Sequence, residues 1–138
     1  MKKLVFIIDD DPVYLQFMKG HFMQMDNYET QIFQSGQDAL KSMATIKPDV
    51  VILDHSFLND PVKTGLDFLQ DIRKLNSSIP VIYITATDNA ELRAKTQKLK
   101  VKSYILKNDG FLIHLRSALD NISTQSKSSG ILKNFFRK

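Results

Sequence analysis

Residues 50–65 read VVILDHSFLNDPVKTG, and the first five letters decide how the rest of the chain is interpreted. Residues 50–53 form an unbroken apolar run rich in β-branched side chains. Such a run is typical of a strand that is buried on both faces of a parallel sheet. The run ends on a single acid, Asp54, where a turn residue is usually found. A carboxylate in that place indicates a functional position rather than a simple turn.

Five short apolar runs predict strands, and helix-like stretches separate them. The runs cover residues 3–8, 29–33, 49–53, 79–84 and 102–106. Large apolar residues recur at helical spacing within residues 15–25, 66–75 and 112–122. Because strands and helices alternate, we expect an α/β fold with one parallel sheet and helices on both faces.

Two local patterns support the helix starts. Asp11 followed by Pro12 is typical of a helix N-terminus, and Asp88-x-x-Glu91 resembles a capping box. The helix predicted over residues 88–99 contains few large apolar residues. We therefore expect it to bury little and to pack loosely.

The composition favours one domain over residues 1–122 and a basic, Ser-rich tail over residues 123–138, which we expect to be flexible. The tail contains Lys127, Lys133, Arg137 and Lys138 and no acid, so it accounts for the whole net charge of +4. The charge therefore says little about what the domain binds.

Without cysteine, disulfides and thiolate metal sites are excluded. No apolar run approaches the roughly 20 residues that span a membrane, and the apolar start is too short for a secretory signal, so we expect a cytoplasmic protein.

The predicted strand ends hold the residues that could do chemistry. In an open parallel sheet, ligands bind beyond the carboxyl ends of the strands. Acids, a hydroxyl and an ammonium occupy those positions: Asp9, Asp10, Asp11, Asp54, Thr85 and Lys107. Asp11 is explained as a helix cap, but the other carboxylates would repel one another unless a cation neutralised them. Oxygen ligands without cysteine or histidine favour Mg²⁺.

Four motifs in this order, VFIIDDDP, VVILD, YITA and YILK, resemble the CheY-like receiver domain of two-component response regulators. The resemblance covers residues 3–122. It implies a flavodoxin-like, doubly wound sheet of five parallel strands in the order 2-1-3-4-5. It also implies that Asp54 accepts a phosphoryl group and that Lys107 pairs with the phosphoryl oxygens.

The same resemblance implies roles for further residues. Mg²⁺ would be bound by Asp10 directly, by Asp9 mainly through water, by Asp54, and by the backbone carbonyl of Ser56. Thr85 would hydrogen-bond a phosphoryl oxygen, and its movement would let the aromatic switch residue, Tyr104, turn inward. His55, next to the phosphoacceptor, is interpreted as a solvated loop residue.

A receiver is a signalling protein, not an enzyme with a separate substrate, and it assists only its own phosphorylation and dephosphorylation. The implied phosphodonor is a histidine kinase or a phosphotransfer protein, and the signal would leave through the face formed by residues 88–122. The downstream partner is not indicated.

No DNA-binding segment follows Ile122, so we expect a stand-alone regulator or phosphorelay carrier without direct nucleic-acid contact. Residues 131–138, ILKNFFRK, could contact a partner or a membrane surface, although the stretch is short for an isolated helix.

Three positions depart from the receiver pattern. Leu58 replaces the usual proline after the phosphoacceptor, and the usual glycine comes three residues late as Gly65. Asn108 replaces the proline that usually follows the lysine through a cis peptide. A cis bond before a residue other than proline costs about 2.5–4 kcal/mol, which puts that feature in question.

Three other functions compete with the receiver interpretation. A phosphatase of the haloacid-dehalogenase type would have a second acid where Ser56 stands. A flavodoxin would bind phosphate at the first loop, where Asp9, Asp10 and Asp11 would repel it. The remaining alternative is a receiver-like interaction module that binds partners without phosphorylation.

Overall fold

The computed structural model describes residues 2–60 and 62–136, with the backbone alone described for residues 124–136. Five parallel strands form one sheet in the order β2-β1-β3-β4-β5, which confirms the predicted flavodoxin-like topology. The strands are β1 (Lys3–Ile8), β2 (Tyr28–Phe33), β3 (Val50–Asp54), β4 (Val81–Thr85) and β5 (Ser103–Leu106). The predicted strand bounds differ from these by at most two residues.

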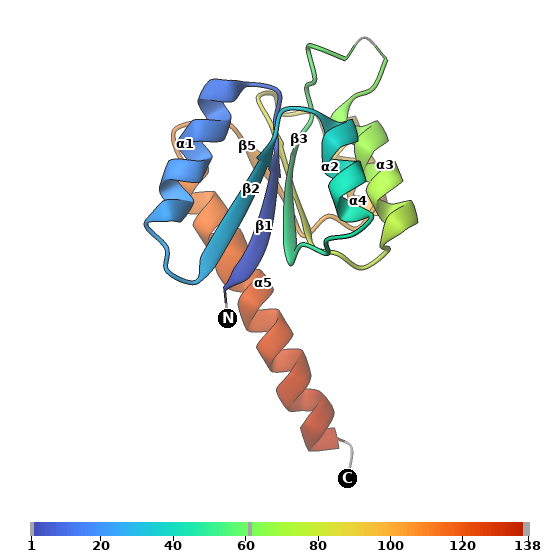
Figure 1. Cartoon of the computed structure of the whole chain (residues 1–138). Coiled ribbons are helices and arrows are strands. Elements are labelled where there is room, and N and C mark those ends of the chain that lie inside the picture. The colour runs from blue at the N-terminus through green and yellow to red at the C-terminus, as the bar shows by residue number, and fades with distance from the viewer. Residues whose placement is uncertain (1, 61, 137–138) are drawn as a thin grey trace.

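Helices cover both faces of the sheet (Figure 1). The helices are α1 (Pro12–Met23), α2 (Gly36–Met43), α3 (Gly65–Leu75), α4 (Ala90–Lys98) and α5 (Phe111–Phe136). The helices α1 and α5 pack on one face, and α2, α3 and α4 pack on the other. No apolar pattern in the sequence predicts α2 specifically, although Ser35 caps its start and Ala39 is buried within it.

The central strand β3 shows why its sequence is apolar throughout. Val50 and Ile52 belong to the core beneath α1 and α5, whereas Val51 and Leu53 belong to the core beneath α2, α3 and α4. All four side chains are at most 2% exposed. Since both faces of the strand are covered, alternation with polar residues would leave polar groups buried without partners.

The order of the strands places a switch point between β1 and β3. The strand β1 pairs with β2 on one side and β3 on the other, and Ile8 lies beside Leu53. The chain leaves β1 and β3 toward opposite faces, so their carboxyl ends border an open edge. Asp9 and Asp54 therefore lie at the place where this fold binds ligands.

The helix starts agree only in part with the sequence. Asp11 caps α1, as predicted, by accepting hydrogen bonds from the Val13 and Tyr14 amides. The predicted capping box at Asp88 is wrong, because Asn89 caps α4 and accepts from the Leu92 amide at 3.0 Å. The only large apolar side chain that α4 buries is that of Leu92, in agreement with the expectation that this helix buries little.

The tail differs from the predicted linker. The backbone of residues 123–136 continues α5, which extends beyond the sheet in Figure 1. Residues 123–130 contain no proline, and serine, threonine, glutamine and lysine, with a single glycine at 130, are tolerated in a helix that has already begun. The side chains of residues 124–138 lie outside the described residues, so the flexibility and the partner or membrane role of the tail stay predictions, as does the boundary at residue 122. No helix in the described part of the chain is long and apolar enough to cross a membrane.

Candidate functional site

Three carboxylates meet at the carboxyl edge of the sheet. Asp9 and Asp10 follow β1, and Asp54 is the last residue of β3. One oxygen from each lies within 4.8 Å of the others. Asp9 is 0% exposed, Asp54 3% and Asp10 9%. Buried acids are rare in proteins unless they are paired or bind a cation, so the cluster needs positive charge.

Lys107 supplies part of that charge from the end of β5. Its Nζ lies 2.7 Å from Asp9 Oδ2 and 3.0 Å from Asp54 Oδ1. The same ammonium lies 4.3 Å from the ring centroid of Tyr14, on α1. Tyr14 was not identified from the sequence, because it contacts the site only through the fold. Its ring face adds a cation–π contact that helps to hold Lys107 between the two acids.

Backbone amides orient each of the three carboxylates. The Asp11 amide donates to Asp9 Oδ1 at 3.0 Å, and the Ser56 amide donates to Asp54 Oδ2 at 3.2 Å. The Asn59 amide donates to Asp10 Oδ2, also at 3.2 Å. Asp10 is the most exposed of the three and has no lysine partner among the described residues. Its oxygens are therefore the most available to a cation.

The electrostatics of the site favour a further cation. Burial raises the pKa of Asp54 to about 6, the charge of Asp9 adds to this, and Lys107 offsets only part of it. Burial also raises the pKa of Asp9. Burial alone would lower the pKa of Lys107, but its hydrogen bond to Asp9 and the charge of Asp54 raise it overall. An acidic, oxygen-only cluster with one ammonium fits a hard divalent cation such as Mg²⁺.

Among the described residues, neither Thr85 nor Tyr104 has a side-chain hydrogen bond to the acidic cluster. Thr85 ends β4 and is 2% exposed, and its hydroxyl donates to the Thr87 carbonyl at 3.3 Å. Tyr104 on β5 stacks on Tyr83 of β4, and its hydroxyl is buried without a hydrogen-bond partner among the described residues. The residue as a whole is half-buried, and the inward turn of Tyr104 after Thr85 moves stays a prediction.

The interpretation of His55 as a solvated residue is wrong. His55 is half-buried, and its Nδ1 lies 2.6 Å from Tyr83 Oη. Burial lowers the pKa of His55 and raises that of Tyr83, so both groups favour their neutral forms. No sequence signal joins the two residues, because Tyr83 lies in an apolar strand whose sequence indicates only core.

The long loop after β3 still returns to a glycine beside the site. The Gly65 amide donates to the His55 carbonyl at 2.7 Å. A β-carbon at this position would come closer than 3.0 Å to the Asp54 carbonyl, to His55 Cα and to Tyr83 Oη, so no larger residue fits. Leu58, which replaces the usual proline, is 91% exposed. The described residues contain no cis peptide bond, so Lys107 and Asn108 are joined in trans.

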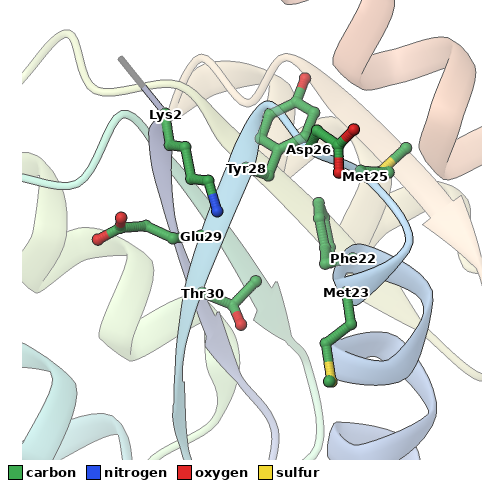
Figure 2. A pocket seen from close by; sticks show the side chains of 8 residues that line it. All are labelled: Lys2, Phe22, Met23, Met25, Asp26, Tyr28, Glu29 and Thr30. Atoms are coloured by element: carbon green, nitrogen blue, oxygen red, sulfur yellow. The ribbon is translucent and has the colours of Figure 1, made fainter.

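A cavity of about 230 Å³ lies at the opposite end of the sheet. Figure 2 shows its lining side chains, which come from Lys2, the end of α1, the following turn and β2. Tyr28, one of them, pairs with Lys3 at the start of β1, whereas the acids follow the end of β1. This cavity is therefore separate from the acidic cluster, which remains the candidate functional site.

Comparisons with known proteins agree with this geometry. The family model of the response regulator receiver domain matches residues 5–114. The transcriptional regulatory protein MalR of Bacillus subtilis is 27% identical over 97% of this chain and 56% of its own length. The Regulator of RpoS of Escherichia coli K12 is 30% identical over 76% of this chain and 30% of its own length. The chain thus spans about half, or less, of the curated relatives that it matches.

A solved structure agrees in fold. The chemotaxis protein CheY4 of Vibrio cholerae superposes with a TM-score of 0.74 and 22% identity, over 88% of this chain and 99% of that one. Receiver domains are signalling domains rather than enzymes with a separate substrate. The match runs from within β1 to the first turn of α5 and includes Asp9, Asp54 and Lys107. The chain belongs to the family of response regulator receiver domains.

Proposed function

We propose that this receiver accepts a phosphoryl group on Asp54, in the presence of Mg²⁺, from a histidine kinase or a phosphotransfer protein. The observation that carries the proposal is the position of Asp54. It ends the central strand, is 3% exposed, and lies within ion-pair distance of Lys107 and beside Asp9 and Asp10. A buried carboxylate held in this way is a positioned nucleophile.

The transfer would proceed by in-line displacement. An oxygen of Asp54 would form a bond to phosphorus while the bond from phosphorus to the donor's histidine nitrogen breaks, and that nitrogen keeps the electron pair. Lys107 would shift from the carboxylates toward the phosphoryl oxygens and stabilise their charge. Mg²⁺ held by Asp9, Asp10, Asp54 and the Ser56 carbonyl would neutralise the remaining charge of the phosphoryl group.

The three acids would contribute differently to binding the cation. Asp9 is already engaged by Lys107 at 2.7 Å and by the Asp11 amide at 3.0 Å. Among the described residues, Asp10 has only the longer hydrogen bond from the Asn59 amide. These contacts support direct binding by Asp10 and binding by Asp9 mainly through water. The same charged groups would also assist water in hydrolysing the acyl phosphate, so the domain would act only on itself.

The signal would leave through the face of residues 88–122. A phosphoryl group adds about −1.5 to −2 charge and new acceptor oxygens. The Thr85 hydroxyl, bonded to the Thr87 carbonyl, could turn to one of those oxygens. That turn would release the loop that leads into α4. Leu92 is the one large apolar residue that α4 buries. A lightly anchored helix can shift at small energetic cost.

The alternative is a receiver-like interaction module that works without phosphorylation. Intact mass spectrometry of the chain, treated with acetyl phosphate and Mg²⁺, separates the two functions. With Mg²⁺, the mass of the chain should increase by one phosphate. When a chelator replaces Mg²⁺, the mass should not change. An unchanged mass with Mg²⁺, in protein shown to be folded, would favour the interaction module.

A further inference from the structure

Tyr83 makes two contacts that the proposed function does not use. It lies on β4, between the acidic cluster and β5, and its side chain is 0% exposed. Its hydroxyl oxygen lies 2.6 Å from Nδ1 of His55, the residue that follows Asp54. Its ring stacks on that of Tyr104, with centroids 6.1 Å apart and an interplanar angle of 17°. One side chain therefore contacts both the phosphoacceptor loop and the neighbouring strand.

The hydroxyl of Tyr83 can donate to Nδ1 of His55 or accept from it, depending on which ring nitrogen of His55 carries the proton. Among the described residues it has no other hydrogen-bond partner, so donation to Nδ1 is the arrangement that leaves its own proton bonded. In that arrangement the proton of the neutral His55 ring lies on Nε2. The bond is also confined, because a β-carbon at Gly65 would come closer than 3.0 Å to both Tyr83 Oη and His55 Cα. The Tyr83–His55 pair therefore has little room to move separately.

The contacts continue from Tyr104 to the start of α4. The Arg93 guanidinium lies 4.3 Å from the Tyr104 ring centroid and 3.1 Å from Asp88. The other end of α4 is anchored independently, because Arg73 Nε donates to the Leu99 carbonyl at 2.7 Å. A displacement of Tyr104 would therefore act on the first turns of α4 more than on its end.

We infer that Tyr83 is a positioning residue that couples the segment after Asp54 to Tyr104 and the start of α4, in parallel with Thr85. The inference rests on the proposed function and deepens it. Through its hydroxyl Tyr83 holds His55, and through its ring it fixes the orientation of Tyr104.

The coupling follows from the bonds around Asp54. The Ser56 amide donates to Asp54 Oδ2, so a change at that oxygen alters the backbone on both sides of His55. The His55 ring moves with this backbone and takes the Tyr83 hydroxyl with it. Packed interiors do not deform continuously, so a stacked pair such as Tyr83 and Tyr104 responds by moving to a second arrangement.

The first test measures the hydrogen bond itself in the full chain. Tyr83→Phe keeps the ring and the stack but removes the hydroxyl, and Tyr28→Phe is the matched control, since Tyr28 is 8% exposed and has no contact with His55. Nitrogen NMR of wild type should show His55 protonated on Nε2, and only Tyr83→Phe should shift the Nδ1 signal. The amides of residues 55–56 should exchange about 5- to 30-fold faster in Tyr83→Phe. If the His55 spectrum of Tyr83→Phe were identical to that of wild type, the inference would be overturned.

The second test measures the coupling. With Mg²⁺ and beryllofluoride, a phosphoryl mimic, amide exchange over residues 88–106 should change in wild type and in Tyr28→Phe. The change should be much smaller in Tyr83→Phe and in His55→Ala, and His55→Asn should restore it, because the asparagine amide oxygen can accept the Tyr83 hydroxyl. Tyr83→Phe with the full wild-type response would refute the coupling. If wild type itself takes no phosphate and shows no response, the proposed function fails, whereas the His55 spectrum still decides the bond.

Discussion

Lys107 Nζ lies 3.0 Å from Asp54 Oδ1, in an ion pair whose side chains are 13% and 4% exposed. Water screens such a pair poorly, so the attraction is strong. Burial nevertheless raises the pKa of Asp54 to about 6, and the nearby charge of Asp9 adds to the effect. The single ammonium therefore does not compensate the negative charge of the acids around it. Adding a cation or removing a carboxylate should stabilise the folded protein.

The stability of the metal-free protein should depend on the charge of Asp54. Its pKa is about 6 in the fold and 3.8 as an unperturbed group. Between these pH values the folded state binds more protons than the unfolded state, so this group's contribution to the free energy of unfolding falls as pH rises. Roughly two pKa units correspond to about 3 kcal/mol, which Asp54→Asn should regain at pH 7. Urea unfolding of both proteins with a chelator, from pH 4 to pH 8, measures the difference. A difference that does not vary with pH would contradict the electrostatic origin.

Removing the carboxylate of Asp10 should weaken Mg²⁺ binding. Asp10→Asn takes away the acid with the most available oxygens, so the dissociation constant for Mg²⁺ should rise at least about tenfold. A tenfold rise corresponds to a loss of about 1.4 kcal/mol of binding free energy. Asp11→Asn is the matched control, because Asn can still cap α1 and Asp11 faces the Val13 and Tyr14 amides. Titration calorimetry measures both variants. Equal Mg²⁺ affinities for Asp10→Asn and wild type would count against direct binding by Asp10.

Lys107 should matter far more for stability than an exposed lysine in a similar ion pair. Lys107→Met leaves Asp9 and Asp54 buried without their partner, which should cost about 3 kcal/mol at pH 7 in chelator. The loss should shrink toward pH 5 as the carboxylates become protonated, and Mg²⁺ should recover part of it. Lys63→Met is the control, since Lys63 pairs with Asp71 at 2.8 Å but both side chains are about a third exposed. That change should cost much less, because water screens an exposed ion pair. Equal losses in urea unfolding would show that the acidic cluster does not depend on Lys107.

Thr85→Ala should separate phosphorylation from its effect on α4. The hydroxyl bonds to the Thr87 carbonyl and not to Asp54, so Asp54 should still take up phosphate in the variant. The beryllofluoride-induced change in amide exchange over residues 88–106 should shrink, because the loop before α4 loses its link to the phosphoryl group. Thr87→Ala, which leaves the Thr87 backbone carbonyl in place, is the control. A full response in Thr85→Ala would exclude this route.

The sequence predicted the sheet and the charged set because both depend on local patterns. Residues 50–53 are apolar on both faces, which alone indicates a central strand, and strand ends are where Asp9, Asp54 and Lys107 were expected to meet. The pairing of β3 with β4 and of β4 with β5 brings the ends of β3 and β5 to the same edge of the sheet, where the long Lys107 side chain can reach Asp54.

Contacts across strands and helices could not be predicted in this way. The bond between His55 and Tyr83 joins a loop to an adjacent strand, and nothing in either local pattern indicates it. Tyr14 under Lys107 depends on how α1 packs against the sheet. The cap of α4 was assigned to Asp88 rather than Asn89 because neighbouring Asp and Asn residues both suit that position. The helical backbone of residues 123–136 was missed because its composition is equally typical of a linker.

Mapping the modified residue is the sharpest test of Asp54 as the phosphoacceptor. The chain would be treated with acetyl phosphate and Mg²⁺, then reduced with borohydride, which converts an acyl phosphate to an alcohol, and fragmented for mass spectrometry. Reduction should turn Asp54, and no other aspartate, into homoserine, and omitting the phosphodonor should abolish the product. Homoserine at Asp9, Asp10 or Asp11, or phosphate on the chain with Asp54 unmodified, would contradict it.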